Sequence, residues 1–251
     1  MEHAEAKVKS LVKAMEVLEC FSIKKPELGV TEIAQELHLQ KSTVHNIMST
    51  FETMGYLVQN RTTGKYSLGV RLLQFSYIIN NQMGYQKFFS PYMEEIATRL
   101  SETVYMGIPH GTEVLYMESK QPQGTMGERR ILGEHAPMYC TGLGKAMLAF
   151  MKPGEMECHF PKEFVKFTEN TLSSREELLE DLARIRERGY SIDNMEHEYG
   201  VVCVALPVFG HDGSPAAAVS VSGPSLRFQK ETIVQAAVTM KEILRPTQYV
   251  L

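Results

Sequence analysis

The stretch of residues 30–68 has the sequence VTEIAQELHLQKSTVHNIMSTFETMGYLVQNRTTGKYSL. Its first part predicts a short helix with Thr31 as the hydroxyl N-cap, because apolar residues then follow at the spacing of one buried face. Its second part predicts another helix, capped by Ser42 or Thr43 and ended by Gly55. The apolar positions of the two helices are Ile33, Ala34, Leu37, Val44, Ile47, Met48, Phe51 and Met54. Two short helices joined by a tight connection predict a helix-turn-helix.

Two β-prone runs, 56–58 and 65–68, follow the second helix, and the polar connection QNRTTG predicts a hairpin with Gly64 near its turn. The pattern is that of a winged helix-turn-helix. The outer face of the second helix carries short donors and acceptors at its N-terminal end, the end that a recognition helix places in the major groove of double-stranded DNA. The residues expected to contact DNA are Thr31, Gln40, Lys41, Ser42, Thr43, His45, Asn46, Arg61 and Lys65. For any one of them the alternative is an ordinary solvated side chain, and the joint pattern is what favours DNA.

The charge of the chain is unevenly distributed. The formal net charge is −4 over 251 residues, yet in residues 40–71 the cations outnumber the single acid, Glu52. The basic surface is local and modest, so one module alone would bind DNA weakly. We therefore expect a homodimer whose half-sites lie about 34–36 Å apart, or a multiple of that distance.

Hydrophobic runs in the chain are too short to span a bilayer, and the N-terminal MEHAEAKVKS lacks the apolar core of a signal peptide. We expect a cytoplasmic protein with no membrane partner. The cysteines are scattered without a CxxC pair, which indicates neither a zinc ribbon nor a disulfide framework. No cofactor and no resident metal are expected.

Two further helices are predicted around the helix-turn-helix. The first covers residues 10–21, with an apolar face made of Leu11, Ala14, Met15, Leu18 and Phe21. The second covers 70–82, with its end at Met83-Gly84, and is apolar over much of its circumference. Such a helix has to be buried, either against a second copy of itself or between two domains.

The rest of the chain alternates helical and β-prone segments. Helices are expected over 91–100, 142–151, 174–189 and 229–244, and strands over 103–108, 113–119, 201–209 and 216–222. Turn signals at His110-Gly111 and His211-Asp212-Gly213 join the strands as hairpins. The pattern predicts an α+β domain of the sensor kind, with a central antiparallel sheet. The expected organisation is a DNA-binding domain over 1–69, a linker helix over 70–84 and a sensor domain over 85–251.

Three C-terminal segments resemble those of the IclR-type bacterial transcriptional regulators, and the resemblance extends over nearly the full length. They are APMYCTGLGKAMLA (136–149), GYSIDNMEHEYGVVCVALPVF (189–209) and AAAVSVSGPSLRF (216–228). The resemblance implies a winged helix, a linker helix and a GAF-like effector-binding domain. It also implies a transcription factor, more often a repressor, that acts as a homodimer or as a homotetramer, a dimer of dimers. Its affinity for operator DNA would be altered by a small metabolite, and it would work at the bacterial nucleoid.

The same segments have a chemical interpretation. The run from Thr141 to Lys145 opens a helix with two glycines, so free backbone N–H groups and the helix dipole offer a seat for a carboxylate. It is not a Walker A loop, because Ala146 stands where that motif needs Ser or Thr. Ser220 and Ser222 lie two residues apart on an apolar strand, so both hydroxyls face the same side. These features predict a polar pocket.

By resemblance, the effector pocket is lined by the backbone of Gly142 and Leu143 and by Asp193, Cys203, Ser220 and Ser222. The plainer alternatives are that Asp193 caps a turn, that Cys203 is an ordinary buried thiol and that the serines bond the backbone. Tyr139 and Cys140 are expected to change pocket specificity relative to other members. An adaptable apolar wall is expected from Tyr105, Met106, Met117, Met126 and Met138, and either Arg129 or Arg130 is a candidate carboxylate clamp.

The effector we expect is a small carboxylate, either a hydroxy or keto acid that includes the sugar acids, or second an aromatic acid. A different class of function remains open. Asp193, His197 and Cys203 or Ser220 can be drawn as a catalytic set, and Cys140 with Asp193, His197 and Cys203 as a metal site. The helix-turn-helix would then serve protein contacts. No nucleophile elbow, HExxH motif or phosphate loop supports that reading, and we expect no enzyme.

Overall fold

The computed structural model describes residues 7–82, 85–122 and 131–247, and the chain divides between Met83 and Gly84 into two units. The expected helix end at Met83-Gly84 and the candidate pocket residues Met126, Arg129 and Arg130 lie outside the described residues. Each unit is described by itself below.

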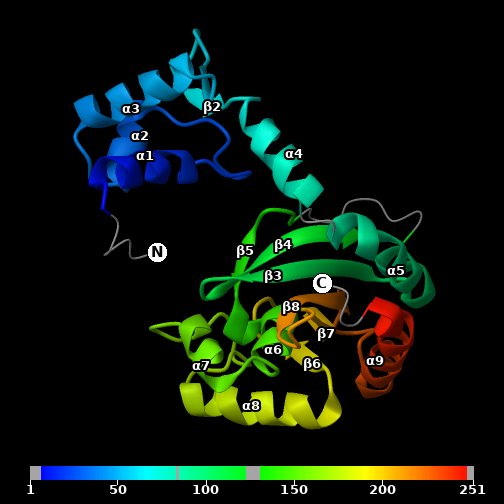
Figure 1. Ribbon diagram of the computed structural model, residues 1–251. Coiled ribbons are helices and arrows are strands. Elements are labelled where there is room, and N and C mark those ends of the chain that lie inside the picture. Colours follow the sequence, from blue (N-terminus) through cyan, green and yellow to red (C-terminus); the bar gives the residue numbers. More distant parts are fainter. Residues whose placement is uncertain (1–6, 83–84, 123–130, 248–251) are drawn as a thin grey trace. The chain divides into compact units, whose positions relative to one another are not determined.

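The N-terminal unit is a winged helix-turn-helix, as predicted (Figure 1). Its elements are α1 (Lys9–Glu19), α2 (Val30–Glu36), α3 (Lys41–Thr53), β1 (Leu57–Gln59), β2 (Tyr66–Leu68) and α4 (Leu72–Gln82). Val17, Ile33, Val44 and Met48 are fully buried at the centre of the three-helix core. Gly55 ends α3 with φ +80, and Gly64 has φ +72 in the hairpin connection, conformations that glycine adopts without strain.

The helix starts differ from the expectation. Gly29, not Thr31, is the N-cap of α2, and its backbone N–H donates to the carboxylate of Glu32 at 2.7 Å. Gln40 precedes α3, so Ser42 and Thr43 lie inside the helix and neither hydroxyl caps it. The reason is that a glutamate at the third helical position supplied the cap of α2, and the extended Gln40 backbone started α3 without a side-chain cap.

The buried face of α1 also differs. Leu11 and Met15 are 60% and 47% exposed, whereas Val17 is fully buried and Cys20 nearly so. The helix turns its Val17 side to the core, so the apolar stripe chosen from periodicity alone was wrong by part of a turn. Phe21 at the end of the stripe is buried as expected.

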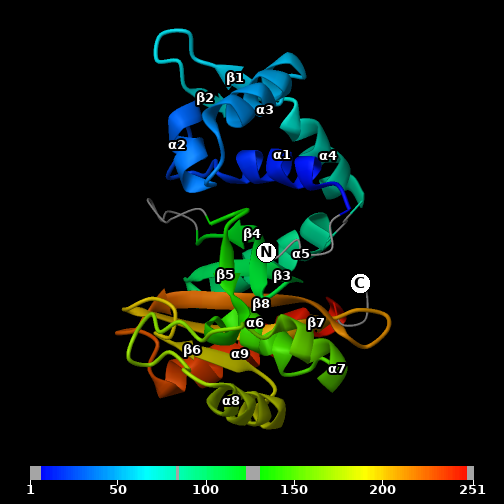
Figure 2. The same cartoon turned by 90° about the vertical axis from the view of Figure 1, so that its left-hand side faces the viewer.

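The C-terminal unit is built on a six-stranded antiparallel sheet of order β5-β4-β3-β8-β7-β6 (Figures 1 and 2). The strands are β3 (Thr103–His110), β4 (Glu113–Lys120), β5 (His135–Pro137), β6 (Ser191–Asn194), β7 (Val201–Phe209) and β8 (Pro215–Pro224). The helices are α5 (Tyr85–Leu100), α6 (Gly142–Leu148), α7 (Pro153–Met156), α8 (Arg175–Arg188) and α9 (Lys230–Leu244), with the 3-10 turns η1 (Met138–Cys140), η2 (Glu157–His159) and η3 (Arg245–Thr247). The predicted α+β class is confirmed.

Side chains alternate between two cores on the two faces of this sheet. Met106, Val204 and Val219 pack with α5 and α9 on one face. Ala205 and Ala218 pack with α6 and α8 on the other. This alternation carries the odd and even residues of β7 and β8 to different layers, as the period of a strand requires.

Several boundaries differ from the sequence prediction. Helix α5 begins at Tyr85 and holds Pro91 inside it, and α6 ends at Leu148. Strands β5 and β6 were not predicted, because β5 is three residues long and β6 is four residues long with Ile192 as its one apolar residue. In the described part of the chain no helix has the length and apolar content needed to cross a membrane.

Candidate functional site

The register of the C-terminal sheet aligns polar residues across four neighbouring strands. Asp193 of β6 is opposite Cys203 of β7, Cys203 is opposite Ser222 of β8, and Ser222 is opposite Thr103 of β3. Ser220, two residues before Ser222, is opposite Tyr105 of β3. The two serines therefore point to one side of the sheet, as the sequence predicts, and share that side with α6.

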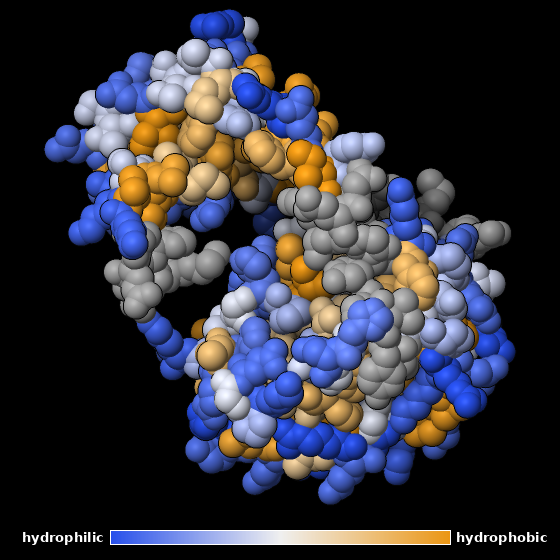
Figure 3. Space-filling model, viewed as in Figure 1, coloured by the Kyte–Doolittle hydropathy of each residue, from blue (hydrophilic) through white to orange (hydrophobic). Residues whose placement is uncertain are grey.

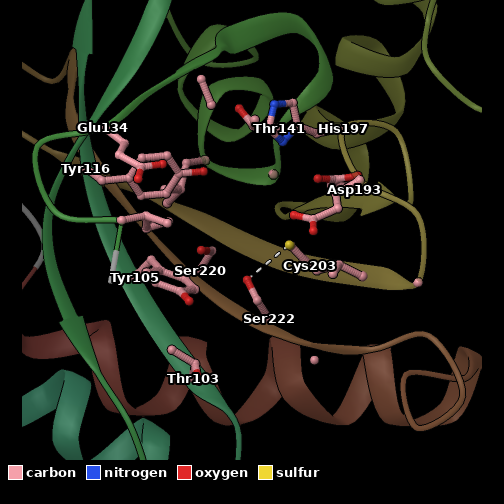
Figure 4. A pocket seen from close by; sticks show the side chains of 18 of the residues that line it. Thr103, Tyr105, Tyr116, Glu134, Thr141, Asp193, His197, Cys203, Ser220 and Ser222 are labelled. Carbon is pink, nitrogen blue, oxygen red and sulfur yellow. Dashed lines mark hydrogen bonds between the residues drawn. The ribbon is translucent and has the colours of Figure 1, made fainter. Parts of the chain in front are cut away.

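These residues line a cavity of about 350 Å³ between the sheet and the start of α6 (Figure 4). The structure brings all six sequence-predicted positions to this one cavity, namely Gly142, Leu143, Asp193, Cys203, Ser220 and Ser222. Thr141 of the predicted carboxylate seat lines it as well, and so does His197, which the sequence placed only in the catalytic and metal sets. The lining also includes residues that the sequence did not single out: Thr103, Tyr116, Ile131, Glu134, His135, Ala136, Glu198, Gly200, Val201, Gly223 and Pro224. Tyr105 was expected and lines it too, with its ring edge-on to Tyr116 at 5.9 Å between centroids.

Local hydrogen bonds fix the polar groups of the cavity. The Ser222 hydroxyl donates to Sγ of Cys203 at 3.0 Å. One carboxyl oxygen of Asp193 accepts the backbone N–H of Glu196 at 2.7 Å, so Asp193 both holds a turn and faces the cavity. The Thr141 hydroxyl accepts the Gly144 N–H at 3.2 Å, which uses one of the donors at the start of α6.

Burial changes the acidity of the groups around the cavity. Desolvation, with Glu196 second, raises the pKa of Asp193 to about 7. Desolvation also raises the pKa of the Cys203 and Cys140 thiols well above their usual value. Because the thiolate is the nucleophilic form, a thiol held protonated in this way is poorly suited to covalent catalysis. This disfavours Cys203 as the nucleophile of the catalytic set drawn from the sequence.

A buried ion network lies under one wall of the cavity. Nζ of Lys145 is 2.8 Å from Asp181 and 2.5 Å from Glu196, and the lysine side chain is 1% exposed. Burial alone would lower the pKa of Lys145, but the two carboxylates raise it. The hydroxyls of Thr168 and Thr171 donate to the carbonyls of Met195 and Glu196 at 2.7 and 2.6 Å. These contacts to Met195 and Glu196 fix the position of the segment that places His197 and Glu198 in the cavity lining.

Several sequence expectations about the pocket were wrong. Met106 and Met138 are fully buried in the two cores, and Met117 is half-buried and does not line the cavity. Tyr139 is also buried, with its hydroxyl donating to the Val165 carbonyl at 2.5 Å, and Cys140 lies beside it in the core. Among the described residues, no three His, Cys, Asp or Glu side chains gather as metal ligands. The open alternative of a metal site at Cys140, Asp193, His197 and Cys203 is not supported.

The expected DNA-contacting residues lie on α2, α3 and the β1–β2 hairpin. Figures 1 and 2 both show the hairpin beside α3. Thr43 is half-buried, and the remaining helix positions are exposed: Thr31, Gln40, Lys41, Ser42, His45 and Asn46.

The two cations of the hairpin have protein partners. Arg61 lies 3.2 Å from Glu52 and Lys65 lies 3.0 Å from Glu32, in exposed ion pairs. Such pairs contribute little stability, so a phosphate can replace the carboxylate at small cost.

Both parts of the chain match known family models. Residues 10–61 match the IclR helix-turn-helix domain, and residues 80–246 match the C-terminal domain of the bacterial transcriptional regulator IclR. The chain is 30% identical to the HTH-type transcriptional regulator XynR of Escherichia coli K12, over 94% of this chain and 97% of that protein. It is 28% identical to the transcriptional repressor IclR of the same strain, over 92% of this chain and 86% of that protein.

The fold also matches a solved structure. An IclR homologue from Microbacterium hydrocarbonoxydans, complexed with 4-hydroxybenzoate, superposes with a TM-score of 0.78 at 23% identity, over 94% of this chain and 99% of that one.

Proposed function

This chain belongs to the IclR family of bacterial transcriptional regulators, and from that premise we propose that it is a repressor whose operator affinity is set by a small acid bound in the cavity of its C-terminal unit. The observation that carries the proposal is the row of Asp193, Cys203, Ser222 and Thr103 across four strands. It presents hydrogen-bonding groups to one cavity that also receives the start of α6. A repressor is proposed because a relative of similar length carries that name.

The effector class follows from what the cavity offers. A hydroxy acid or sugar acid would meet the hydroxyls of Thr103, Ser220 and Ser222, which donate and accept hydrogen bonds. The rings of Tyr105 and Tyr116 would cover the carbon skeleton, and they also suit an aromatic acid. The homologue complexed with 4-hydroxybenzoate supports the aromatic acid as the second candidate.

The operator is proposed to be bound by α3 and the hairpin. Lys41, Ser42, His45 and Asn46 form the exposed face of α3 at its N-terminal end, where base edges would be read, with Gln40 and Thr43 beside them. Arg61 and Lys65 would exchange their carboxylate partners for phosphates. Thr31 on α2 would add a backbone contact. Operator DNA places the protein in the cytoplasm, at the nucleoid.

A homodimer is proposed from the apolar surface of the N-terminal unit. Leu11 and Met15 on α1 and Leu73, Tyr77 and Ile78 on α4 are 47–72% exposed within this unit. Figure 3 shows apolar side chains gathered over these two helices. An apolar patch of this kind marks an interaction site, and a second copy would cover it and set two recognition helices on one operator. Sedimentation of the pure protein tests the dimer, and pairing of dimers would appear as a tetramer.

Population shift connects the two sites. The effector would favour one of two states that differ in operator affinity, and a tenfold change requires it to prefer one state by about 1.4 kcal/mol. The helix α4 would carry the change between the two units. The proposal assigns the protein a regulatory rather than a catalytic role.

The test combines two measurements on the full-length protein. A panel of hydroxy acids, sugar acids and aromatic acids is screened by thermal unfolding, since a ligand that binds only the folded state raises the midpoint. Each acid that binds is then added to the protein with DNA upstream of its own gene.

Ser222→Ala should keep DNA affinity and lose the effector response. Cys158→Ala, an exposed cysteine away from the cavity lining, serves as the matched control and should keep both. Loss of DNA binding by folded Ser222→Ala protein would contradict the assignment of the cavity.

A further inference from the structure

The described wall of the cavity is rich in acids and poor in cations. Asp193, Glu134 and Glu198 line it, and among the described lining residues none is a lysine or an arginine. The imidazoles of His135 and His197 are the described lining groups able to carry a positive charge. A carboxylate effector that met three ionised acids here would be repelled, and the neutral hydroxyls of Thr103, Ser220 and Ser222 do not offset those charges, so the acid effector of the proposed function requires that an acid on this wall be protonated.

The nearby ammonium of Lys145 is committed elsewhere. Its Nζ contacts Asp181 and Glu196, so one positive charge already faces two carboxylates in the interior. Oε2 of Glu196 is buried and has no hydrogen-bond partner among the described residues. Arg184 and Arg188 approach the network only at Asp181, at 3.5 and 3.9 Å. Both arginines therefore meet the network on its Asp181 side, and Lys145 is the cation that the described residues provide at Glu196.

Asp193 would be that further carboxylate. It is 5% exposed, and its carboxyl is joined to Glu196 through the backbone N–H of that residue. Ionising Asp193 would place a second negative charge beside that of Glu196 in a region that water hardly reaches. Buried carboxyls in such surroundings keep their proton.

The pKa of Asp193 agrees with this geometry. Desolvation and then Glu196 raise its pKa to about 7, against the lowering influence of Lys145 and of the backbone N–H groups of Glu196 and His197. The titratable and charged groups around it come from its own segment, from α6, from η1 and from two strands. They are Glu196, His197, Glu198, Lys145, Cys140, Cys203 and Tyr116.

We propose that Asp193 is the protonated partner of the effector, and that its carboxylic acid donates a hydrogen bond to the effector's carboxylate. A hydrogen bond from an acid to a carboxylate is short and strong because one partner is charged. Above pH 7 the binding of an acid then takes up one proton, and its affinity falls tenfold for each further pH unit. This inference rests on the proposed function, because it describes how that cavity accepts an acid.

The experiment measures affinity against pH with two probes, D-gluconate for the sugar acids and 4-hydroxybenzoate for the aromatic acids. Titration calorimetry of the full-length protein is run between pH 6 and 9, in two buffers of different ionisation enthalpy, which counts the protons taken up. The wild type should lose about tenfold in affinity per unit above pH 7 and take up close to one proton at pH 8.

Two variants separate Asp193 from the histidines. Asp193→Asn, whose amide donates at every pH, should bind the acid without a slope above pH 7. His197→Gln should keep the wild-type slope, because it leaves the donor in place. A slope that survives in Asp193→Asn and vanishes in His197→Gln would assign the pH dependence to the imidazole and overturn the proposal.

Two further outcomes separate a failure of the protonated Asp193 from a failure of the acid effector itself. Acids that bind with a flat affinity between pH 6 and 9 overturn the protonated donor and leave the acid effector intact. If neither acid binds at any pH, the acid effector and its donor both fail. The titration of Asp193 in unliganded protein, followed by NMR with ¹³C-labelled aspartate and assigned with Asp193→Asn, gives a readout without ligand. A midpoint below pH 5 would overturn the proposal whatever the ligand.

Discussion

Replacing Lys145 with methionine should destabilise the C-terminal unit strongly, because it leaves the buried carboxylate of Glu196 without its cation and Asp181 with only its longer contacts to Arg184 and Arg188. The Lys145 ammonium is 1% exposed and sits 2.8 Å from Asp181 and 2.5 Å from Glu196, whose side chains are about 10% and 8% exposed. Methionine has a similar length and no charge, so the substitution removes the ion and preserves most of the packing.

The size of the effect follows from the cost of an unpaired buried charge. Removing one partner of a buried ion pair costs about 3–5 kcal/mol. Each kcal/mol lowers the unfolding midpoint of a domain of this size by about 2–4 °C, so Lys145→Met should lower Tm by roughly 6–20 °C. Adding Glu196→Gln should recover part of the loss, because it removes the carboxylate that Lys145→Met leaves without a cation.

Circular dichroism is the suitable assay, since the chain has no tryptophan to report by fluorescence. Thermal and urea unfolding are compared for the wild type, Lys145→Met, the double variant and Lys166→Met, which changes an exposed lysine in the same unit. Lys166→Met should unfold like the wild type. The reasoning is refuted if Lys145→Met is as stable as Lys166→Met, or if the double variant is less stable than Lys145→Met alone.

Three further predictions concern other parts of the chain. Because the pKa of Asp193 is raised from 3.8 to about 7 in the folded protein, the wild type loses stability as pH rises from about 4 to 7. Asp193→Asn has no such loss, so its advantage in urea unfolding should grow by about 1.4 kcal/mol per pH unit, to about 4 kcal/mol, and stay level above pH 7. Gly144→Ala should cost about 1–3 kcal/mol, since a Cβ there would lie 2.3 Å from the Met138 backbone, and Gly154→Ala, with open space around it, should cost little by the same assay. Arg61→Gln should lower the slope of log affinity for operator DNA against log salt by about one, and an unchanged slope would show that Arg61 contacts no phosphate.

Caps, turn residues and apolar periodicity predicted most of the helices and strands, because the interactions that start and end these elements lie within a few residues. Ser174 accepts the Glu177 N–H at the start of α8, and Gly189 ends that helix with φ +77, so both ends followed from residue type. The positions of Ser220 and Ser222 on one face of β8 followed from the two-residue period of a strand. The bounds of β7 agree residue for residue with the predicted 201–209.

The errors arose where the deciding contact is distant or where two local signals compete. Nothing in the sequence around Lys145 indicates partners 36 and 51 residues away, and these contacts decide the charge beneath the cavity. Tyr116 reaches the cavity because β4 pairs with β3, as the His110-Gly111 turn predicted, and because β3 pairs with β8, which no turn signal specifies. In α2 the glutamate at the third position competed with the Thr31 hydroxyl for the cap, and the glutamate supplied it.

The proton on Asp193 also constrains how pH can alter regulation. If Asp193 has the same pKa in the two states that differ in operator affinity, protonation changes effector binding to both states equally and leaves their preference unchanged. Raising pH from 7.5 to 8.5 should then raise the effector concentration for half response about tenfold, with the same maximal change in operator affinity. DNA binding titrated with the effector at both pH values measures the two quantities separately. A maximal change that differs between the two pH values would mean that the states bind this proton unequally, and that the carboxyl takes part in the switch as well as in holding the ligand.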